Sequence, residues 1–98
     1  MDIGSLRANF QGFYGQFTQV EQNQKVLSDT DAKFNIFMDR LSDGNLNPLT
    51  LQKLQALSDS IEQANHQGCG TAMRELTQQC WGDVKEFSNA LKVLSNYR

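Results

Sequence analysis

Apolar residues recur every three or four positions along most of the chain, which is the spacing of one face of an α-helix. They predict a first helix over residues 3–20 and a second over 19–42. Thr18 and Glu21 have the spacing of a capping box, which favours a new helix start near them. The apolar positions of the two stripes are Ile3, Leu6, Phe10, Phe13, Phe17, Val20, Leu27, Phe34, Phe37 and Leu41. Because large apolar side chains are usually buried, we expect the phenylalanines of the first helix to form core rather than a partner groove.

A chain reversal over residues 43–47 is predicted to separate the second helix from the third. Gly44 suits the left-handed conformation that ends many helices. Asn47 can cap the next helix, and Pro48 fits its first position because that position needs no backbone N–H. The third helix is therefore expected over residues 48–66. Its buried stripe is expected to consist of Leu51, Leu54, Leu57, Ile61 and Ala64.

The last part of the chain contains two predicted breaks. The triplet Gly68-Cys69-Gly70 predicts the first break, after which Thr71 can cap a short fourth helix. The second break is predicted at Trp81-Gly82-Asp83, where Asp83 is placed to cap the last helix. The positions expected to be buried in these two helices are Ala72, Met73, Leu76, Val84, Phe87, Leu91 and Leu94. We expect Trp81 to be buried at the second break, and the alternative is an exposed side chain that anchors an interface.

Two groups of residues outside these stripes allow two interpretations each. The first group comprises Ala90, Val93 and Tyr97. It forms either a second core contact or an exposed patch. The second group comprises Gly4, Ala8 and Gly12. Their spacing would let another helix approach closely, but we favour a weak helix end because their neighbours are polar.

The fold class predicted by these elements is all-α. No segment carries a strand signal, and Pro48 is the single proline. Short predicted connections place consecutive helices side by side in opposite directions, so we expect an antiparallel bundle of about five helices. A length of 98 residues is typical of one domain. The expected organisation is therefore a single helical-bundle domain over residues 1–98.

Charge and composition exclude several classes of function. Nine Lys and Arg oppose eleven Asp and Glu, which gives a formal net charge of −2. The chain therefore lacks the basic field that non-specific nucleic-acid binding requires, and we expect no nucleic-acid partner. No apolar run approaches the roughly 20 residues that span a bilayer, and the first ten residues lack the order of a signal peptide. These features predict a cytosolic or nuclear protein.

No set of residues with catalytic or metal-binding spacing is visible. Cys69 and Cys80 lie outside any CxxC motif and are expected to be reduced thiols. His66 is the single histidine, whereas a zinc site needs four ligands. The remaining acidic candidates, expected on a solvated face, are Asp29, Asp31, Asp39 and Asp43. We predict no catalytic residue, no cofactor and no metal ligand, so the chain is not expected to be an enzyme, and the residues that bind protein stay unassigned.

Two segments of the chain resemble a known family. The first is MDRLSDGNLNPLTLQKLQALSDSIEQ, in which a helix end at Leu41 is followed by the loop Leu46-Asn47-Pro48 and spaced leucines. The second is CWGDVKEFSNALKVL, which begins beside Trp81 and contains Leu91-Lys92. Together they are similar to the C-terminal helical domain of the large scaffold subunit of the COPII outer coat, a domain family that includes the steroid receptor RNA activator protein. The resemblance covers the first helix only loosely, and the turn at Gly68-Cys69-Gly70 is shorter than in the family.

The resemblance implies a non-catalytic protein-interaction module that contributes to COPII cage assembly in transport from the endoplasmic reticulum to the Golgi. It implies a cytoplasmic location at exit sites and vesicle coats, other coat subunits as partners, and an isolated domain that is monomeric and reaches membranes only through the coat. The alternative is a nuclear transcription coregulator domain of the same family. The chain ends soon after its last expected helix, as the coat subunit does, whereas the coregulator carries a further tail. We therefore expect the C-terminal module of a longer coat protein.

Overall fold

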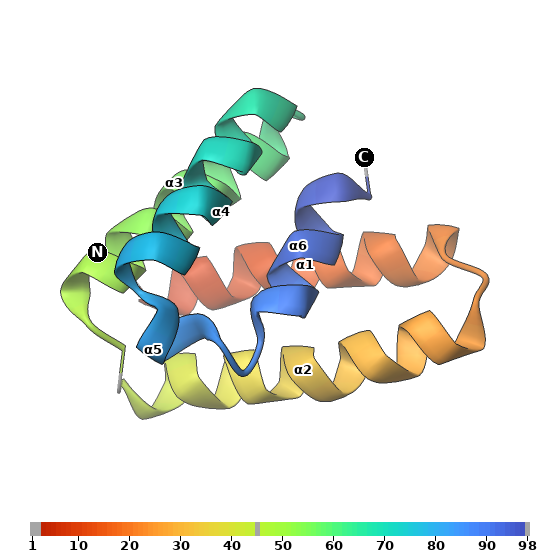
Figure 1. Ribbon diagram of the computed structural model, residues 1–98. Coiled ribbons are helices and arrows are strands. Elements are labelled where there is room, and N and C mark those ends of the chain that lie inside the picture. The colour runs from red at the N-terminus through yellow and green to blue at the C-terminus, as the bar shows by residue number, and fades with distance from the viewer. Residues whose placement is uncertain (1–2, 45, 98) are drawn as a thin grey trace.

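The computed structural model describes residues 3–44 and 46–97, and these residues contain six α-helices. The helices are α1 (Ile3–Val20), α2 (Gln24–Asp43), α3 (Pro48–Glu62), α4 (His66–Gln79), α5 (Trp81–Val84) and α6 (Ser88–Asn96). α1 and α2 form one antiparallel pair, and α3 and α4 form a second (Figure 1). The all-α bundle predicted from the sequence is therefore confirmed, with the single turn of α5 as an additional element.

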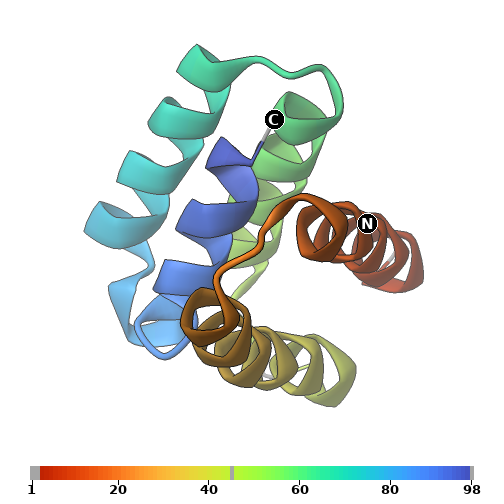
Figure 2. The same ribbon diagram turned by 90° about the vertical axis from the view of Figure 1, so that its right-hand side faces the viewer.

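The last helix, α6, lies at the centre of the bundle. It packs between the α1–α2 pair and the α3–α4 pair and contacts all four of these helices (Figure 2). Ala90 of α6 is fully buried, and Val93 and Tyr97 pack partly buried against the core. These three residues therefore form a second core contact rather than an exposed patch. The central position of α6 makes the fold depend on the C-terminal part of the sequence.

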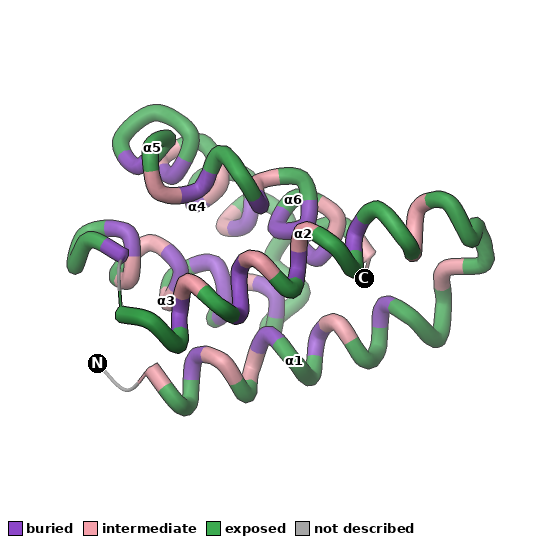
Figure 3. Tube along the Cα trace, turned by 90° about the horizontal axis from the view of Figure 1, so that it is seen from below, coloured by how far each residue is buried: buried purple, intermediate pink, exposed green. Residues whose placement is uncertain are grey.

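Aromatic side chains connect the α1–α2 pair to the segment that precedes α6. The ring of Phe37 in α2 lies 4.9 Å from that of Phe10 in α1 and 4.8 Å from that of Phe87, which precedes α6. All three rings are fully buried, and Phe13 and Phe17 of α1 are buried with them. Figure 3 shows buried positions recurring along α1 and α2 on the sides that face the bundle. The expectation that the phenylalanines of the first helix form core is confirmed.

The join between α1 and α2 differs from the predicted one. α2 begins at Gln24 rather than at residue 19, because Asn23 has an extended backbone and its side chain accepts hydrogen bonds from two N–H groups of the first turn. Thr18 and Glu21 form no capping box: the Thr18 hydroxyl donates to the Gly15 carbonyl, and the Glu21 carboxylate accepts from backbone N–H groups of the loop. The chain between the helices is therefore a short loop closed by Glu21 and Asn23.

The reversal between α2 and α3 follows the prediction. Gly44 has a φ of 69°, and its N–H donates to the Leu41 carbonyl at 3.3 Å. The Asn47 side chain accepts from the Leu49 N–H at 2.9 Å, and Pro48 occupies the first position of α3. Asn45, which is part of the predicted reversal, lies outside the described residues. The local signals were sufficient here because each acts within one turn of its own helix.

The junction of α3 and α4 contradicts the predicted one. α3 ends at Glu62, and Ala64 adopts a left-handed φ of 55°, so His66 lies at the start of α4 instead of the end of α3. Asn65 caps α4 by accepting from the Gly68 N–H at 3.1 Å. The helix then runs through the glycine triplet that was predicted to break it, and Thr71, expected to be a cap, donates within the helix to the Gln67 carbonyl. An earlier cap thus replaced the predicted one.

Close packing explains one of the two glycines. A Cβ atom at Gly68 would lie 2.5 Å from the Ser60 hydroxyl, which is closer than non-bonded atoms come, whereas a Cβ at Gly70 would meet nothing within 4 Å. Gly68 therefore permits the start of α4 to approach the end of α3.

The predicted stripe of α3 is correct at its centre, but Leu51 is only partly buried and Ala64 is exposed. On the outer side of α1, Gly4, Ala8 and Gly12 are exposed within the helix, and a Cβ at Gly12 would meet nothing within 4 Å, so no described helix approaches closely at Gly12.

The second predicted break contains a full helical turn, α5. Asp83 lies inside this turn and does not cap the last helix, which begins at Ser88. Trp81, expected to be buried, is 50% exposed. The buried positions here are Cys80 and Val84, which lie on the side of the turn that faces the core. The alternative interpretation of Trp81, an exposed aromatic side chain, is therefore the one that matches the structure.

Candidate functional site

The residues weighed as candidates for chemistry are dispersed. Among residues 3–44 and 46–97, no three His, Cys, Asp or Glu side chains are grouped so that they could hold a metal ion. Cys69 and Cys80 are buried free thiols, as predicted, and burial raises the pKa of Cys69, which disfavours a reactive thiolate. The exposed acidic positions are Asp29, Asp31, Asp39 and Asp43. The solvated acidic face predicted for the second helix is confirmed.

One of these carboxylates has a structural partner. The Tyr14 hydroxyl donates to Asp31 at 2.7 Å, while the Tyr14 ring stacks on Phe34 at 4.3 Å. Burial and the hydrogen bond to Asp31 raise the pKa of Tyr14 to about 12, so its hydroxyl stays protonated at neutral pH.

No helix within the described part of the chain is long and apolar enough to cross a membrane. The candidate sites described next are features of the protein surface.

The best-defined surface feature is a corner at which α5 meets the start of α3. The Asp83 carboxylate accepts hydrogen bonds from the Asn47 N–H at 3.0 Å and from the Thr50 hydroxyl at 2.7 Å. These two donors, followed by the charge of Arg40, hold the pKa of Asp83 below its usual range. Arg40 of α2 lies 3.8 Å from both Asp83 and Glu86. Asp83 thus connects the chain reversal, α3, α5 and α2.

Two large apolar side chains are exposed at this corner. Trp81 is 50% exposed and Leu49 is 39% exposed. Leu49 lines a hollow of about 220 Å³ together with Cys80, Gly82 and Asp83, which lie within two positions of Trp81 in the chain. Aromatic side chains surrounded by a polar rim are typical of the centres of protein interfaces. We call Leu49, Trp81 and Asp83 the Trp81 corner.

Asp83→Asn is expected to lower the free energy of unfolding by about 1 kcal/mol at pH 7, because hydrogen bonds to a charged acceptor become bonds to a neutral one. The folded-state pKa of Asp83 is lowered, so this stability is complete above the unfolded-state value near ~4 and is lost as pH falls through the lower folded-state value. Urea unfolding at pH 7 and at low pH measures both effects. Asp39→Asn, at an exposed carboxylate on α2, is the control. An equal effect of the two variants at pH 7 would contradict this role of Asp83.

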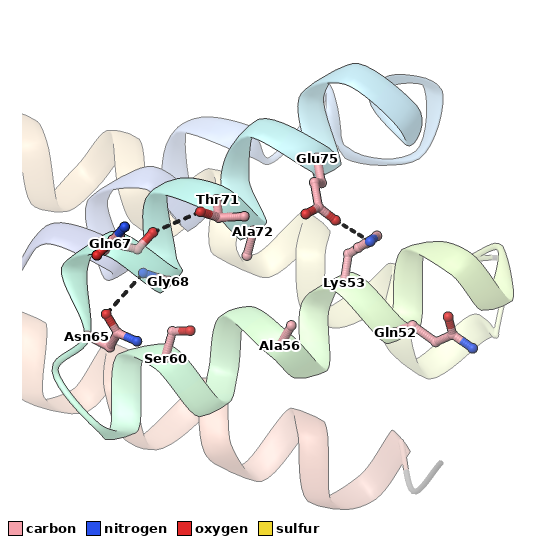
Figure 4. Close-up of a pocket in the computed structure, with 10 residues that line it drawn as sticks. All are labelled: Gln52, Lys53, Ala56, Ser60, Asn65, Gln67, Gly68, Thr71, Ala72 and Glu75. Carbon is pink, nitrogen blue, oxygen red and sulfur yellow. Dashed lines mark hydrogen bonds and ion pairs between the residues drawn. The ribbon is translucent and has the colours of Figure 1, made fainter.

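The described surface has further hollows, and four of them are prominent. The largest, about 540 Å³, runs between α3 and α4, where small side chains form the floor and an ion pair of Lys53 with Glu75 crosses from helix to helix (Figure 4). Two hollows of about 360 and 420 Å³ share Val26 and Val93 where α6 crosses the α1–α2 pair. The fourth, about 340 Å³, lies between α4 and α6. Cys69 and His66 both line this last hollow, but burial raises the pKa of the Cys69 thiol, which disfavours the thiolate that covalent catalysis would require.

The comparisons with known proteins give no relative: no protein-family model, no curated protein and no solved structure matches the chain.

No site residue was predicted from the sequence, and the Trp81 corner was missed. Trp81 itself carried a signal, because a lone Trp in a predicted break is either a core or an interface side chain. Leu49 and the bond from Asn47 to Asp83 carried none, since 36 residues separate the two bonded groups.

Proposed function

We propose that this chain is a non-catalytic protein-interaction module of the COPII outer coat that contributes to cage assembly in transport from the endoplasmic reticulum to the Golgi. The observation that supports the proposal is the Trp81 corner. The two segments that carry the resemblance to the coat domain lie far apart in the sequence. They meet where Asp83 accepts hydrogen bonds from Asn47 and Thr50. The residues that carry the resemblance thus belong to one folded unit.

The exposed side chains of the corner are suited to a partner protein. Trp is the residue type most often found to dominate binding energy at interfaces, and Leu49 beside the hollow offers additional apolar area. A coat lattice repeats each contact many times, so single contacts can be weak. We therefore propose that other coat subunits bind at this corner, with an affinity of the isolated domain of about tens of micromolar or weaker.

The test is budding from synthetic membranes with purified coat components, comparing the scaffold subunit with and without this domain. Deletion is expected to weaken assembly of the outer coat without abolishing recruitment of the inner coat. The double variant Leu49→Ala/Trp81→Ala should reproduce most of that loss, with a reduction in binding of the isolated domain of about tenfold or more. Val20→Ala removes another exposed apolar side chain, 61% exposed on α1, and should behave as the wild type.

Both corner side chains are exposed, so the double variant should retain its fold, and circular dichroism checks this before assembly is measured. Unchanged cage order and vesicle yield on deletion of the domain, including with partners whose main cage contacts are weakened, would reject the coat role. A loss on deletion that the corner variant does not reproduce would keep the coat role and reject the corner as its contact surface.

A further inference from the structure

The hollow between α4 and α6 differs in charge from the other four hollows described above. Arg74 and Lys92 line it, together with His66 at the start of α4. No Asp or Glu is among its lining residues. The other four hollows described above each contain a carboxylate. It is Glu75 in the hollow between α3 and α4, Glu21 and Asp29 in the two hollows where α6 crosses the α1–α2 pair, and Asp83 at the Trp81 corner. We call the hollow formed by Arg74, Lys92, His66 and Met73 the α4–α6 cleft.

The two fixed cations of this cleft have no carboxylate partner in the described part of the chain. Arg74 and Lys92 are both exposed, and neither takes part in an ion pair. Lys92 also borders the hollow that contains Glu21, but the two do not pair. By contrast, Lys53 and Arg40 have carboxylate partners. In a chain of net charge −2, two unpaired cations on one cleft are a local concentration of positive charge.

The other residues that line the cleft indicate which kind of ligand it can bind. The hydroxyls of Thr77 and Ser95 donate to carbonyls of their own helices, at 2.9 and 2.7 Å, so they are occupied as donors. The charged groups are therefore the principal donors toward an anion. Met73 is partly buried and packs against the core, and its thioether is an adaptable apolar surface. The cleft can thus contact an apolar side chain flanked by negative charges.

We propose that the α4–α6 cleft binds an acidic segment of a partner protein, with Asp or Glu carboxylates on Arg74 and Lys92 and an apolar side chain on Met73. Charge complementarity favours this occupant over a nucleic acid, which needs an extended basic stripe rather than two cations on an acidic chain. The Arg74 guanidinium is suited to bidentate contact with a carboxylate. This surface is separate from the Trp81 corner, so the inference does not depend on the coat role.

The test uses the whole 98-residue chain and a fluorescein-labelled peptide that alternates glutamate pairs with single leucines. Binding is measured by fluorescence anisotropy at low salt, and the site is located by amide chemical-shift changes in the ¹⁵N-labelled protein. We expect the shifts to concentrate on residues 66–77 and 92–96. Binding should weaken as salt rises, because exposed charges are screened. The same peptide with glutamine in place of glutamate should not bind measurably.

The decisive variant is Arg74→Glu/Lys92→Glu, which should weaken peptide binding by about tenfold or more, since two attractive contacts become repulsive. Lys25→Glu/Lys85→Glu changes net charge by the same amount at two exposed lysines outside the cleft and should bind as the wild type. Arg74→Gln/Lys92→Gln removes the charges without adding acidic groups and should weaken binding less. Because the altered side chains are exposed, all variants should unfold at the temperature of the wild type within a few degrees.

Four outcomes would overturn the proposal. Equal losses in the cleft variant and the Lys25/Lys85 variant would mean that net charge alone attracts the peptide. Shifts centred on other helices would place the site elsewhere. Tighter binding of an oligouridylate of matching charge than of the peptide would make the cleft a nucleic-acid surface. The absence of any binding by the wild type at low salt would equally reject it.

Discussion

Phe37→Ala is expected to lower the free energy of unfolding by about 3–5 kcal/mol, the largest effect of a single substitution that we expect in this chain. Phe37 is fully buried, and its ring lies within 5 Å of the rings of Phe10 and Phe87. The substitution opens a cavity where α1, α2 and the start of α6 meet. Because small domains are stable by only about 5–15 kcal/mol, the variant should be marginally folded.

Urea unfolding followed by far-UV circular dichroism measures this effect, and Phe37→Leu is the control. Leucine keeps most of the apolar volume, so it should cost clearly less than alanine. The aromatic pairs contribute about 0.5–1.5 kcal/mol each beyond burial, so some loss should remain in the leucine variant. A cost below about 1 kcal/mol for Phe37→Ala would contradict the packing of α2 described above.

The parts of the fold that could be predicted from the sequence are those determined within one or two turns of helix. The phenylalanine stripe of α1 fixes which side of that helix is buried, and it does so whatever the helix packs against. Gly44, Asn47 and Pro48 end one helix and begin the next with bonds to groups no more than three residues away. Signals of this kind compete with few alternatives, and the structure agrees with them.

Predictions failed where another local cap or a tertiary contact was stronger than the predicted local signal. The glycine triplet was interpreted as a break, but the Asn65 cap and the close approach of Gly68 to Ser60 continue the helix through it. Asp83 has the residue type of a helix cap, yet its carboxylate bonds to Asn47 and Thr50 across the fold. A glycine can end a helix or allow two helices to pack closely, and an aspartate can cap a helix or accept a hydrogen bond from a distant part of the chain. The neighbouring residues in the sequence do not show which of these roles applies.

The candidate surfaces depend still more on tertiary structure. Cys80 and Val84 are buried while Trp81 is exposed, and the hollow formed by the neighbours of Trp81 is also lined by Leu49, which lies 32 positions before Trp81 in the sequence. The α4–α6 cleft exists because α6 packs against α4, which places Arg74 and Lys92 on the same hollow. Neither cation belongs to a basic run of the sequence. A surface formed by single residues from separate helices has no sequence pattern of its own.

Leu54→Ala is expected to lower the free energy of unfolding by about 2–5 kcal/mol, whereas Leu49→Ala in the same helix should cost no more than about 0.5 kcal/mol. Leu54 is fully buried, and Leu49 is 39% exposed at the Trp81 corner. The two variants remove the same atoms from α3, so burial is the main difference between them. Urea unfolding of both variants measures the contrast.

Binding to coat partners should reverse the order of the two variants. Leu49→Ala should weaken the contact made by a fully folded domain, because it removes apolar area from the proposed interface. Leu54→Ala should leave the affinity of its folded fraction unchanged, since its side chain does not reach the surface. Binding is therefore measured at a temperature at which circular dichroism shows both variants folded. Equal losses of stability in the two variants would contradict the burial pattern of α3. Wild-type affinity of Leu49→Ala for the coat partner would mean that Leu49 is not part of the proposed interface.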